Sequence, residues 1–346
     1  MFKYISLVIV VLLLVLVTTT AYMSRPLFSE QRSELPALPA IAPRSQAVTF
    51  ARTENGLYLV TDIQSQNIEA INISSIYGSD TQLDLIKLYQ KIGHDSMTKI
   101  TGPLEIIDLN ELQLPMDFGA VHLAAGTNYK EHSEEVLLDD PPFLFPKNIP
   151  PTPWNASIKY TKRLDYEAEL AAVPLSTIQS PDDKPFFGLI LANDFTDRWT
   201  LIKGLNLRKP MGTTGFAASK GQKSFLPTGC FLVIPKDEDF YNTIELRLYV
   251  NNKLRQRFKA EDMILKINDI VQQSFVDSNN VFYNGKTEVA LIPKEGIKGG
   301  SMILTGTAGG VIFKPVNIWW QGIYLKKGDV VRTEASFLGN LENKID

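Results

Sequence analysis

The sequence predicts a mainly β protein with some α-helix, that is, an α+β fold. After Phe118, most of the chain consists of short apolar runs separated by glycine and proline, a pattern typical of strands joined by tight turns. In this part, Asp262–Ser274 has the apolar spacing of a clear helix. Residues 47–117 combine strand-like pieces with a helical stretch at Leu83–Ile92.

The strands expected after Phe118 share apolar side chains and flanking glycine or proline residues. They are Ala120–Ala125, Glu167–Val173, Phe187–Ala192, Phe231–Ile234, Glu245–Val250, Ser301–Thr305 and Val330–Ala335. In the earlier part, Asn55-Gly56 lies between two strand-like runs and predicts a hairpin turn. We therefore divide the folded part into a small N-terminal α+β domain at 47–117 and a larger domain at 118–346.

The N-terminus begins with an apolar run from Ile5 to Val17, preceded by Lys3. With the residues that follow, the run reaches about 20 residues, the length that crosses a bilayer. Residues 1–23 therefore predict an N-terminal membrane anchor, with a cleaved signal sequence and a secreted or periplasmic protein as the alternative. Either interpretation places the folded domains outside the cytoplasm. Residues 24–46 are rich in proline and predict an extended linker.

The composition is that of an ordinary globular protein, with 44% hydrophobic and 21% charged residues. The net charge is −3 and no basic block is present, which argues against nucleic acid as a partner. Cys230 is the only cysteine, so the chain forms no intrachain disulfide and no cysteine metal cluster. Its apolar surroundings predict a buried thiol.

Residues 165–169 read Asp-Tyr-Glu-Ala-Glu, and Asn193-Asp194 follows the next expected strand. Glu167 and Glu169 are two apart in a strand-like run, so both carboxylates point to the same face. Two like charges on one buried face are costly to desolvate unless a cation lies between them. Together with Asp194 they form a set of oxygen ligands that suits Mg²⁺ or Mn²⁺. Two solvated glutamates on an edge strand are the alternative for this motif alone.

Several further segments occur together with this acidic motif. They read AAGTNYKEHSEE at 124–135, FLFPK at 143–147, ASKGQKSFLPTG at 218–229, LRLYVNNKLRQ at 246–256, EDMILKINDIVQQS at 261–274, ILTGTAGGV at 303–311 and YLKKGDVVRTEASFLGNLEN at 324–343. In this order they resemble the fumarylacetoacetate hydrolase family over residues 118–346. The resemblance implies that family's mainly β fold, a distorted roll or barrel with the site at its centre, and a homodimer.

The resemblance also implies roles for individual residues. Glu167, Glu169 and Asp194 match the metal ligands, with Mg²⁺ as the expected ion and Mn²⁺ or Ca²⁺ as alternatives. His132 and Glu135 match the family's catalytic dyad. They are three apart in a segment that looks helical, so they share a helix face. A carboxylate beside an imidazole raises its basicity, which suits a base that activates water.

Lys220 matches the family's active-site lysine, whose ammonium group would stabilise a substrate oxygen as it gains negative charge. The residues expected to bind substrate match polar or glycine positions of the family's motifs. They are Asn128, Tyr129, Lys147, Arg198, Thr305, Gly306 and Thr307. The chain departs from the family pattern at Asp197 and Trp199, and at Ala308, where proline is usual.

These residues together predict a metal-dependent hydrolase that cleaves a carbon–carbon bond in an acylpyruvate-type 2-oxo acid or another 1,3-dicarbonyl compound. The dyad would activate water, and the metal and Lys220 would hold the departing enolate. An oxaloacetate-type decarboxylase, an isomerase and a hydratase on the same scaffold are the enzymatic alternatives. A non-catalytic, membrane-tethered binding domain is the alternative from another class, because the motifs depart from the family at Asp197, Trp199 and Ala308.

Overall fold

The computed structural model describes residues 2–78, 84–137, 141–318 and 320–346. Its largest element is a ten-stranded sheet in which neighbouring strands are antiparallel, except for the parallel pair β16–β5. In spatial order the strands are β4 (Leu104–Asp108), β3 (Asn67–Asn72), β2 (Gly56–Ile63), β1 (Ala47–Thr53), β11 (Leu232–Pro235), β9 (Phe187–Asn193), β8 (Ala168–Pro174), β16 (Ile303–Leu304), β5 (His122–Gly126) and β6 (Phe143–Lys147).

A second sheet packs on the large one. Its strands, in spatial order, are β13 (Lys253–Lys259), β12 (Glu245–Val250), β17 (Val330–Ala335) and β18 (Gly339–Lys344). β12 contacts β8, and both β17 and β18 contact β9. In β13 the buried residues are Leu254, Gln256 and Phe258, as the two-residue period of a strand requires. The two sheets share one apolar core, which confirms the mainly β fold with some helix.

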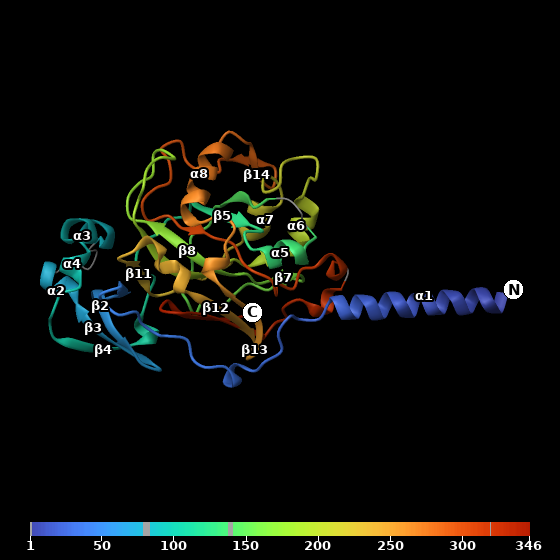
Figure 1. Ribbon diagram of the computed structural model, residues 1–346, viewed down its shortest axis with the longest axis horizontal. Helices are drawn as coiled ribbons and strands as arrows, with labels where there is room; N and C mark the ends of the chain where they lie inside the picture. The colour runs from blue at the N-terminus through green and yellow to red at the C-terminus, as the bar shows by residue number, and fades with distance from the viewer. Residues whose placement is uncertain (1, 79–83, 138–140, 319) are drawn as a thin grey trace.

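The N-terminal strands continue the large sheet, because β1 pairs antiparallel with β11 and places Phe50 opposite Leu232. The hairpin predicted at Asn55-Gly56 joins β1 to β2. Figure 1 shows three short helices beside these strands, namely α2 (Ile73–Tyr77), α3 (Leu85–Ile92) and α4 (His94–Met97). Of the predicted helical stretch Leu83–Ile92, Leu83 lies outside the described residues. The division between residues 117 and 118 stays a prediction.

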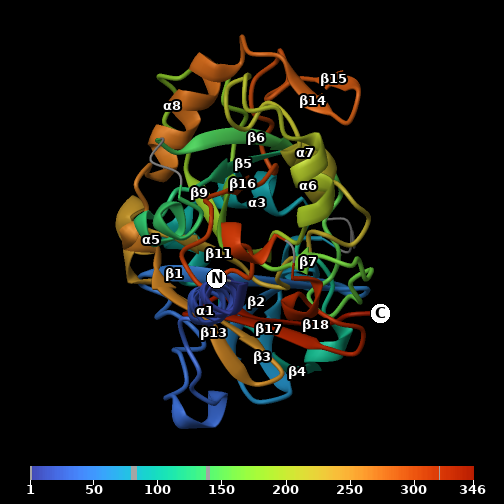
Figure 2. The ribbon, with the colours of Figure 1, turned by 90° about the vertical axis from the view of Figure 1, so that its right-hand side faces the viewer.

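Helices flank the other end of the large sheet. They are α5 (Lys130–Glu135), α6 (Arg198–Gly204), α7 (Phe216–Lys220) and α8 (Ile267–Asp277). Figure 2 shows α5 and α8 on one side of β5 and β6, and α6 and α7 on the other. α8 begins at Ile267 and not at Asp262, because the Asp269 carboxylate accepts a hydrogen bond from the Lys266 N–H and caps the helix there.

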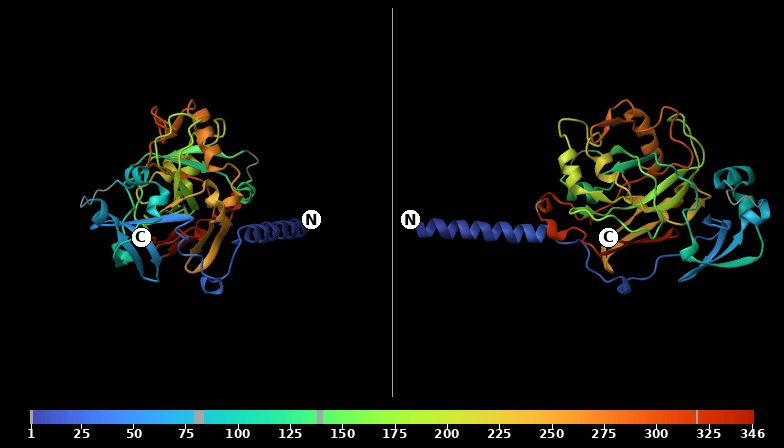
Figure 3. Two further views of the ribbon diagram at one scale, coloured as in Figure 1. Left: turned by 60° about the vertical axis from the view of Figure 1, so that its left-hand side comes forward. Right: turned by 180° about the vertical axis from the view of Figure 1, so that it is seen from behind.

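Helix α1 (Phe2–Met23) extends away from the rest of the molecule, as Figures 1 and 3 show. The segment that follows lies along the edge of the four-stranded sheet. The Arg32 N–H donates to the Asn252 carbonyl (2.8 Å), and the Leu254 N–H donates to the Glu30 carbonyl (2.9 Å). We call residues 24–39 the N-terminal strap. These hydrogen bonds attach the strap to strand β13.

The prediction of a membrane anchor at residues 1–23 is wrong. Among the helices in the described part of the chain, none is both long enough and apolar enough to cross a bilayer. In the sequence, the apolar run Ile5–Val17 is followed by the polar residues Thr18–Thr20. This stretch is shorter than the about 20 apolar residues of a membrane span. The extracytoplasmic location was predicted from this anchor and is therefore not retained.

Candidate active site

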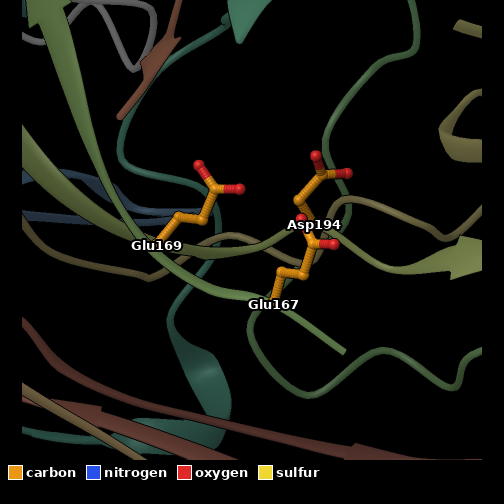
Figure 4. Close-up of side chains that lie close together, drawn as sticks. All are labelled: Glu167, Glu169 and Asp194. Carbon is orange, nitrogen blue, oxygen red and sulfur yellow. The ribbon is translucent and has the colours of Figure 1, made fainter. Parts of the chain in front are cut away.

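The three acidic residues of the sequence motif meet at one end of the β8–β9 ladder. Ala168 in β8 is opposite Asn193 in β9, so Glu167 and Asp194, which flank this pair, are neighbours. The Asp194 N–H donates to the Glu167 carbonyl (2.9 Å). Glu169 is two residues further along the chain and therefore points to the same face as Glu167. Figure 4 shows the three carboxylates around a common space.

These carboxylates form a compact, buried cluster. One oxygen from each lies within 4.8 Å of the other two, and the relative exposure is 6% for Glu167 and 0% for Glu169 and Asp194. Glu169 Oε2 accepts a hydrogen bond from the Gly306 N–H (2.7 Å). Its Oε1 is buried without a hydrogen-bond partner among the described residues. Burial, together with repulsion by Asp194 and Glu167, raises the pKa of Glu169 well above its usual value.

Two buried lysines lie against the cluster. Lys220 Nζ, at the end of α7, lies 2.6 Å from Glu167 Oε2 and 2.9 Å from Asp194 Oδ2. Lys147 Nζ, at the end of β6, lies 2.5 Å from Asp194 Oδ1 and also donates to the carbonyls of Lys220 and Phe225. Because its three donors are all used, Lys147 holds Asp194 in place and has no donor left for a substrate.

Arg198 joins Glu167 to Asp165. Its Nε donates to Asp165 Oδ2 (2.8 Å) and its Nη2 donates to Glu167 Oε1 (2.5 Å). Arg198 is placed by the start of α6, where the Asp197 carboxylate accepts hydrogen bonds from N–H groups of the first turn. Burial opposes ionisation of Glu167, but the Lys220 and Arg198 cations outweigh burial and lower its pKa to about 2.

The donor set fits a hard divalent cation. Glu167, Glu169 and Asp194 offer three carboxylates on one buried face, and such ions prefer oxygen ligands. Glu169 Oε1, which no donor in the described part of the chain contacts, is an acceptor that a bound cation would satisfy. The structure therefore contains a possible acidic metal site, as predicted. The choice of Mg²⁺ stays a prediction.

The predicted dyad lies on one helix, but no hydrogen bond joins its two members among the described contacts. His132 and Glu135 are both in α5. Glu135 Oε2 accepts a hydrogen bond from the Gly310 N–H (2.8 Å), and its Oε1 lies 3.5 Å from Lys314 Nζ. His132 Nδ1 is buried without a described partner. Burial lowers the pKa of His132 to about 4, so the ring is neutral near pH 7 and able to accept a proton.

Asn128 and Tyr129 immediately precede α5. The Asn128 amide donates to the carbonyls of Leu265 and Thr305 (2.9 Å each) and accepts from the Leu265 N–H (2.7 Å). The Asn128 amide therefore links the loops that contain Leu265 and Thr305, and its donors and its acceptor are already used by backbone groups. The Tyr129 hydroxyl is buried without a described partner, and burial, with the nearby Glu169 charge, raises its pKa. Of these two predicted substrate-binding residues, Tyr129 retains a donor for a ligand.

The Thr305–Thr307 triplet lies against Glu169 through the Gly306 N–H. The Thr305 hydroxyl donates to a carbonyl of β8 (2.9 Å), and the Thr307 hydroxyl accepts from Gln256 Nε2 (2.8 Å). The two hydroxyl groups therefore support the loop. The Gly306 N–H orients one of the candidate metal ligands.

The sequence motifs do not predict three supporting residues, namely Asp165, Gln256 and Lys314. Asp165 accepts hydrogen bonds from Arg198 and from two N–H groups at 312–313. Gln256 accepts from the Ala168 N–H (3.0 Å) and so links β13 to β8. Asp165 and Gln256 belong to segments that carry the family resemblance, which is a signal that could have identified them. Lys314 belongs to an irregular segment that carries no such signal.

The fold and the buried acidic cluster define a mainly β protein with a candidate divalent-metal site. The chain belongs to the fumarylacetoacetate hydrolase family, since the family model "Fumarylacetoacetate (FAA) hydrolase C-terminal" matches residues 122–346. A 2,4-didehydro-3-deoxy-L-rhamnonate hydrolase of Sphingomonas sp. (strain SKA58) is 27% identical over 235 residues, 64% of this chain and 72% of that protein. A fumarylacetoacetate hydrolase domain-containing protein 2 homolog of Dictyostelium discoideum is 27% identical over 256 residues, 68% and 74% of the two chains.

Solved structures share the fold. A probable 2-hydroxyhepta-2,4-diene-1,7-dioate isomerase from Mycobacterium abscessus has a TM-score of 0.57 at 20% identity, covering 86% of this chain and 97% of that chain. The maleylpyruvate hydrolase of Sphingobium sp. SYK-6, in complex with manganese(II) ion and pyruvate, has a TM-score of 0.56 at 18% identity, covering 86% and 98%. Two of these four proteins are named as hydrolases and one as a probable isomerase, and the matching family model is that of a hydrolase, so the protein belongs to a family of enzymes.

Proposed function

We propose that the protein is a divalent-metal-dependent hydrolase that cleaves a carbon–carbon bond in an acylpyruvate-type 2-oxo acid. The observation that carries this proposal is the charge arrangement of the site. Four buried carboxylates face three buried cations, in a set formed by Asp165, Glu167, Glu169, Asp194, Lys147, Lys220 and Arg198. With every carboxylate ionised, a divalent ion changes the net charge of this set from negative to positive, which favours an anionic substrate such as a 2-oxo acid.

Glu167, Glu169 and Asp194 would hold the ion, which would polarise substrate oxygens and stabilise the negative charge of an enolate. We assign Lys220 to stabilise the same negative charge on the enolate. Its ammonium group already lies against Glu167 and Asp194, so a substrate oxygen bound beside these residues lies near its N–H donors. Such a donor in a buried site stabilises negative charge more strongly than it would in water.

His132 is the group that we assign to proton transfer. Its neutral ring would accept a proton from water while the water oxygen attacks the distal carbonyl carbon of the substrate. The bond between this carbonyl carbon and the neighbouring carbon then breaks. Its electron pair stays on the neighbouring carbon, whose fragment becomes the enolate. A proton returns to the neighbouring carbon to give the second product. We assign Glu135, on the same helix, to stabilise the protonated His132 ring.

The names of similar proteins support this assignment. Two of them are a 2,4-didehydro-3-deoxy-L-rhamnonate hydrolase and a maleylpyruvate hydrolase, and the second was solved with a manganese(II) ion and pyruvate. Mn²⁺ and Mg²⁺ share a preference for oxygen ligands. We therefore propose that either ion serves this site.

An isomerase is the second candidate function. It is favoured by the arrangement of His132 and Glu135, which no hydrogen bond joins in the described structure. Isomerisation needs only the removal and return of a proton, which His132 could perform without activating water. A decarboxylase and a hydratase are distinguished from both by their products, and a non-catalytic binding protein by the absence of turnover.

The test uses the full-length protein with Mg²⁺ or Mn²⁺ and an acylpyruvate, and it follows the enol absorbance and the products. A hydrolase releases pyruvate and a carboxylic acid in equal amounts. EDTA or Glu169→Gln should abolish turnover, and His132→Asn should lower kcat about 100-fold. The exposed Glu295 offers a matched control, because Glu295→Gln should leave turnover unchanged.

Each other outcome identifies another function. Carbon dioxide as a product would indicate a decarboxylase, and a shifted double bond without cleavage would indicate an isomerase. Addition of water to a double bond would indicate a hydratase. Metal binding without turnover on a panel of oxo acids would overturn the enzymatic proposal.

We also propose that the protein is a homodimer that acts on a small-molecule oxo acid and binds no nucleic acid. The dimer follows from the family resemblance, and the exclusion of nucleic acid follows from the net charge of −3. Light scattering coupled to size-exclusion chromatography measures the assembly. A monomeric mass at working concentrations would contradict the dimer.

A further inference from the structure

Lys314 lies between the N-terminal strap and Glu135. Its Nζ donates to the Arg25 carbonyl (3.1 Å) and lies 3.5 Å from Glu135 Oε1. The Lys314 and Glu135 side chains are only 13% and 10% exposed, so water screens their attraction less than it screens a surface ion pair. Lys314 is therefore placed to act on Glu135.

The orientation of Glu135 is set by the segment that carries Lys314. Glu135 Oε2 accepts the Gly310 N–H (2.8 Å), so both carboxylate oxygens face residues 310–314. Gly310 has φ +100°, and a Cβ there would lie 2.0 Å from the Arg255 carbonyl oxygen. Glycine is required for this close approach, which brings its N–H to Glu135.

The segment at 310–317 is held by the body of the site and by the strap. The Ile312 N–H donates to Asp165 Oδ1 (2.9 Å), and the Asn317 amide donates to the Ile312 carbonyl (2.6 Å). The Ser24 hydroxyl donates to Asn317 Oδ1 (2.6 Å). The strap therefore reaches this segment twice, through the Arg25 carbonyl and through the Ser24 side chain.

We propose that Lys314 is a positioning residue that keeps Glu135 ionised and in place. The Arg25 carbonyl of the strap holds Lys314 directly, and Ser24 holds the same segment through Asn317. This inference rests on the proposed function, because Glu135 matters to the reaction as the partner of His132. Lys314 acts through Glu135 and makes no described contact with the candidate metal ligands.

The charged and titratable groups that face Glu135 decide its ionisation. They are Lys314, Asp165 and Tyr166, and on its own helix Glu131 and His132. Burial raises the pKa of Glu135 and the Asp165 charge adds to this, whereas the Gly310 N–H and Lys314 lower it. Removal of the Lys314 cation therefore raises the pKa of Glu135 further. A larger share of Glu135 is then neutral at mildly acidic pH and cannot stabilise a protonated His132.

The first test is the pH profile of kcat with an acylpyruvate and Mn²⁺. Lys314→Met should move the acid limb upward by about one pH unit, which is about a tenfold loss of kcat on the sloping part of the limb and little loss on the plateau. KM and the affinity for Mn²⁺ should not change, and Lys314→Arg should keep the wild-type limb. Ser24→Ala should move the limb in the same direction by less.

Two results of this test would overturn the inference. An equal loss of kcat at every pH in Lys314→Met would show that Lys314 has only a structural role. An unshifted acid limb in Ser24→Ala would remove the strap from the proposal.

The second test needs no turnover and compares urea unfolding at pH 4.5 and pH 7.5. Attraction between Lys314 and Glu135 requires an ionised Glu135, so Lys314→Met should lower the urea midpoint more at pH 7.5. In the Glu135→Gln background this pH dependence should disappear. Equal shifts at both pH values would overturn the pairing. If the wild type turns over no substrate but the effect of Lys314→Met on the urea midpoint depends on pH as expected, the proposed function fails while the Lys314–Glu135 pairing stands.

Discussion

The ammonium group of Lys147 lies 2.5 Å from Asp194 Oδ1, and both side chains are completely excluded from solvent. Lys147 ends β6 and Asp194 follows β9, so the pair joins strands that are not neighbours in the sheet. Burial lowers the pKa of Lys147, and the Asp194 charge opposes this effect. The pair therefore holds one candidate metal ligand in position through a contact between distant parts of the chain.

Lys147→Met should destabilise the protein by about 3 kcal/mol, because it leaves Asp194 buried with one cation fewer. The double variant Lys147→Met/Asp194→Asn should recover part of this loss, because it removes the unpaired charge. Urea unfolding at pH 7 measures both variants. A loss below about 1 kcal/mol in the single variant would contradict the role of the pair.

Glu169→Gln should lower the affinity for Mn²⁺ by about 100-fold or more, because it removes one of three anionic ligands. The fold should be retained, since glutamine has the shape of the neutral carboxylic acid that burial favours at this position. Isothermal titration calorimetry measures the affinity, with Glu295→Gln as the control. Unchanged Mn²⁺ binding in Glu169→Gln would show that the metal does not bind at this cluster.

Bound metal should also stabilise the folded protein. Mn²⁺ at about 100 times its dissociation constant should raise the free energy of unfolding by about 2.7 kcal/mol, and EDTA should reverse the gain. Thermal unfolding with and without Mn²⁺ checks this effect. The gain should be absent in a Glu167→Gln/Glu169→Gln variant, and a gain of equal size there would exclude the acidic cluster as its source.

Gly306→Ala should cost about 1–3 kcal/mol of stability and weaken metal binding. Gly306 has φ +86°, and a Cβ there would lie 3.0 Å from Asn128 Cβ and 3.1 Å from the Ala125 carbonyl oxygen. Gly285 is the matched control, because it has φ +64° with nothing within 4 Å of the added Cβ. Gly285→Ala should carry the backbone strain alone and leave metal affinity unchanged. Equal effects of the two variants on Mn²⁺ affinity would contradict this prediction.

His122 should make the protein less stable in mild acid. Its Nδ1 accepts the Met302 N–H (3.1 Å), and burial, together with the Lys147 charge, lowers its pKa to about 4. The unfolded chain therefore takes up this proton near pH 6.5, and stability falls as the pH drops from there toward 4. Between pH 7 and pH 5 the loss from His122 is about 2 kcal/mol.

His122→Asn tests this contribution, because the asparagine oxygen can still accept the Met302 N–H but does not titrate. The free energy of unfolding of this variant should fall less than that of the wild type between pH 7 and pH 5. Parallel pH profiles for the two proteins would show that His122 does not contribute.

The seven strands that the sequence predicts after Phe118 are all present, whereas β6, β13 and β18 are among those that it does not predict. A strand has a strict two-residue period. That period places Glu167 and Glu169 on one face, and the structure brings Asp194 to them through the β8–β9 pairing. Local signals are weaker at element ends. α8 begins at Ile267 and not at Asp262, since Asp269 caps it with a side chain that apolar periodicity does not register.

The sequence alone was sufficient for the mainly β fold, the family and a candidate metal site, because these depend on local periodicity and on motifs within short segments. Tertiary structure decided the partners of each charge. Helical spacing correctly places His132 and Glu135 on one helix, but Glu135 pairs with Gly310 and Lys314, which are far away in the chain. Lys147 likewise meets Asp194 only when β6 and β9 are assembled. A buried charge pairs with the opposite charge that tertiary packing brings closest, and spacing along the chain does not predict which residue that is.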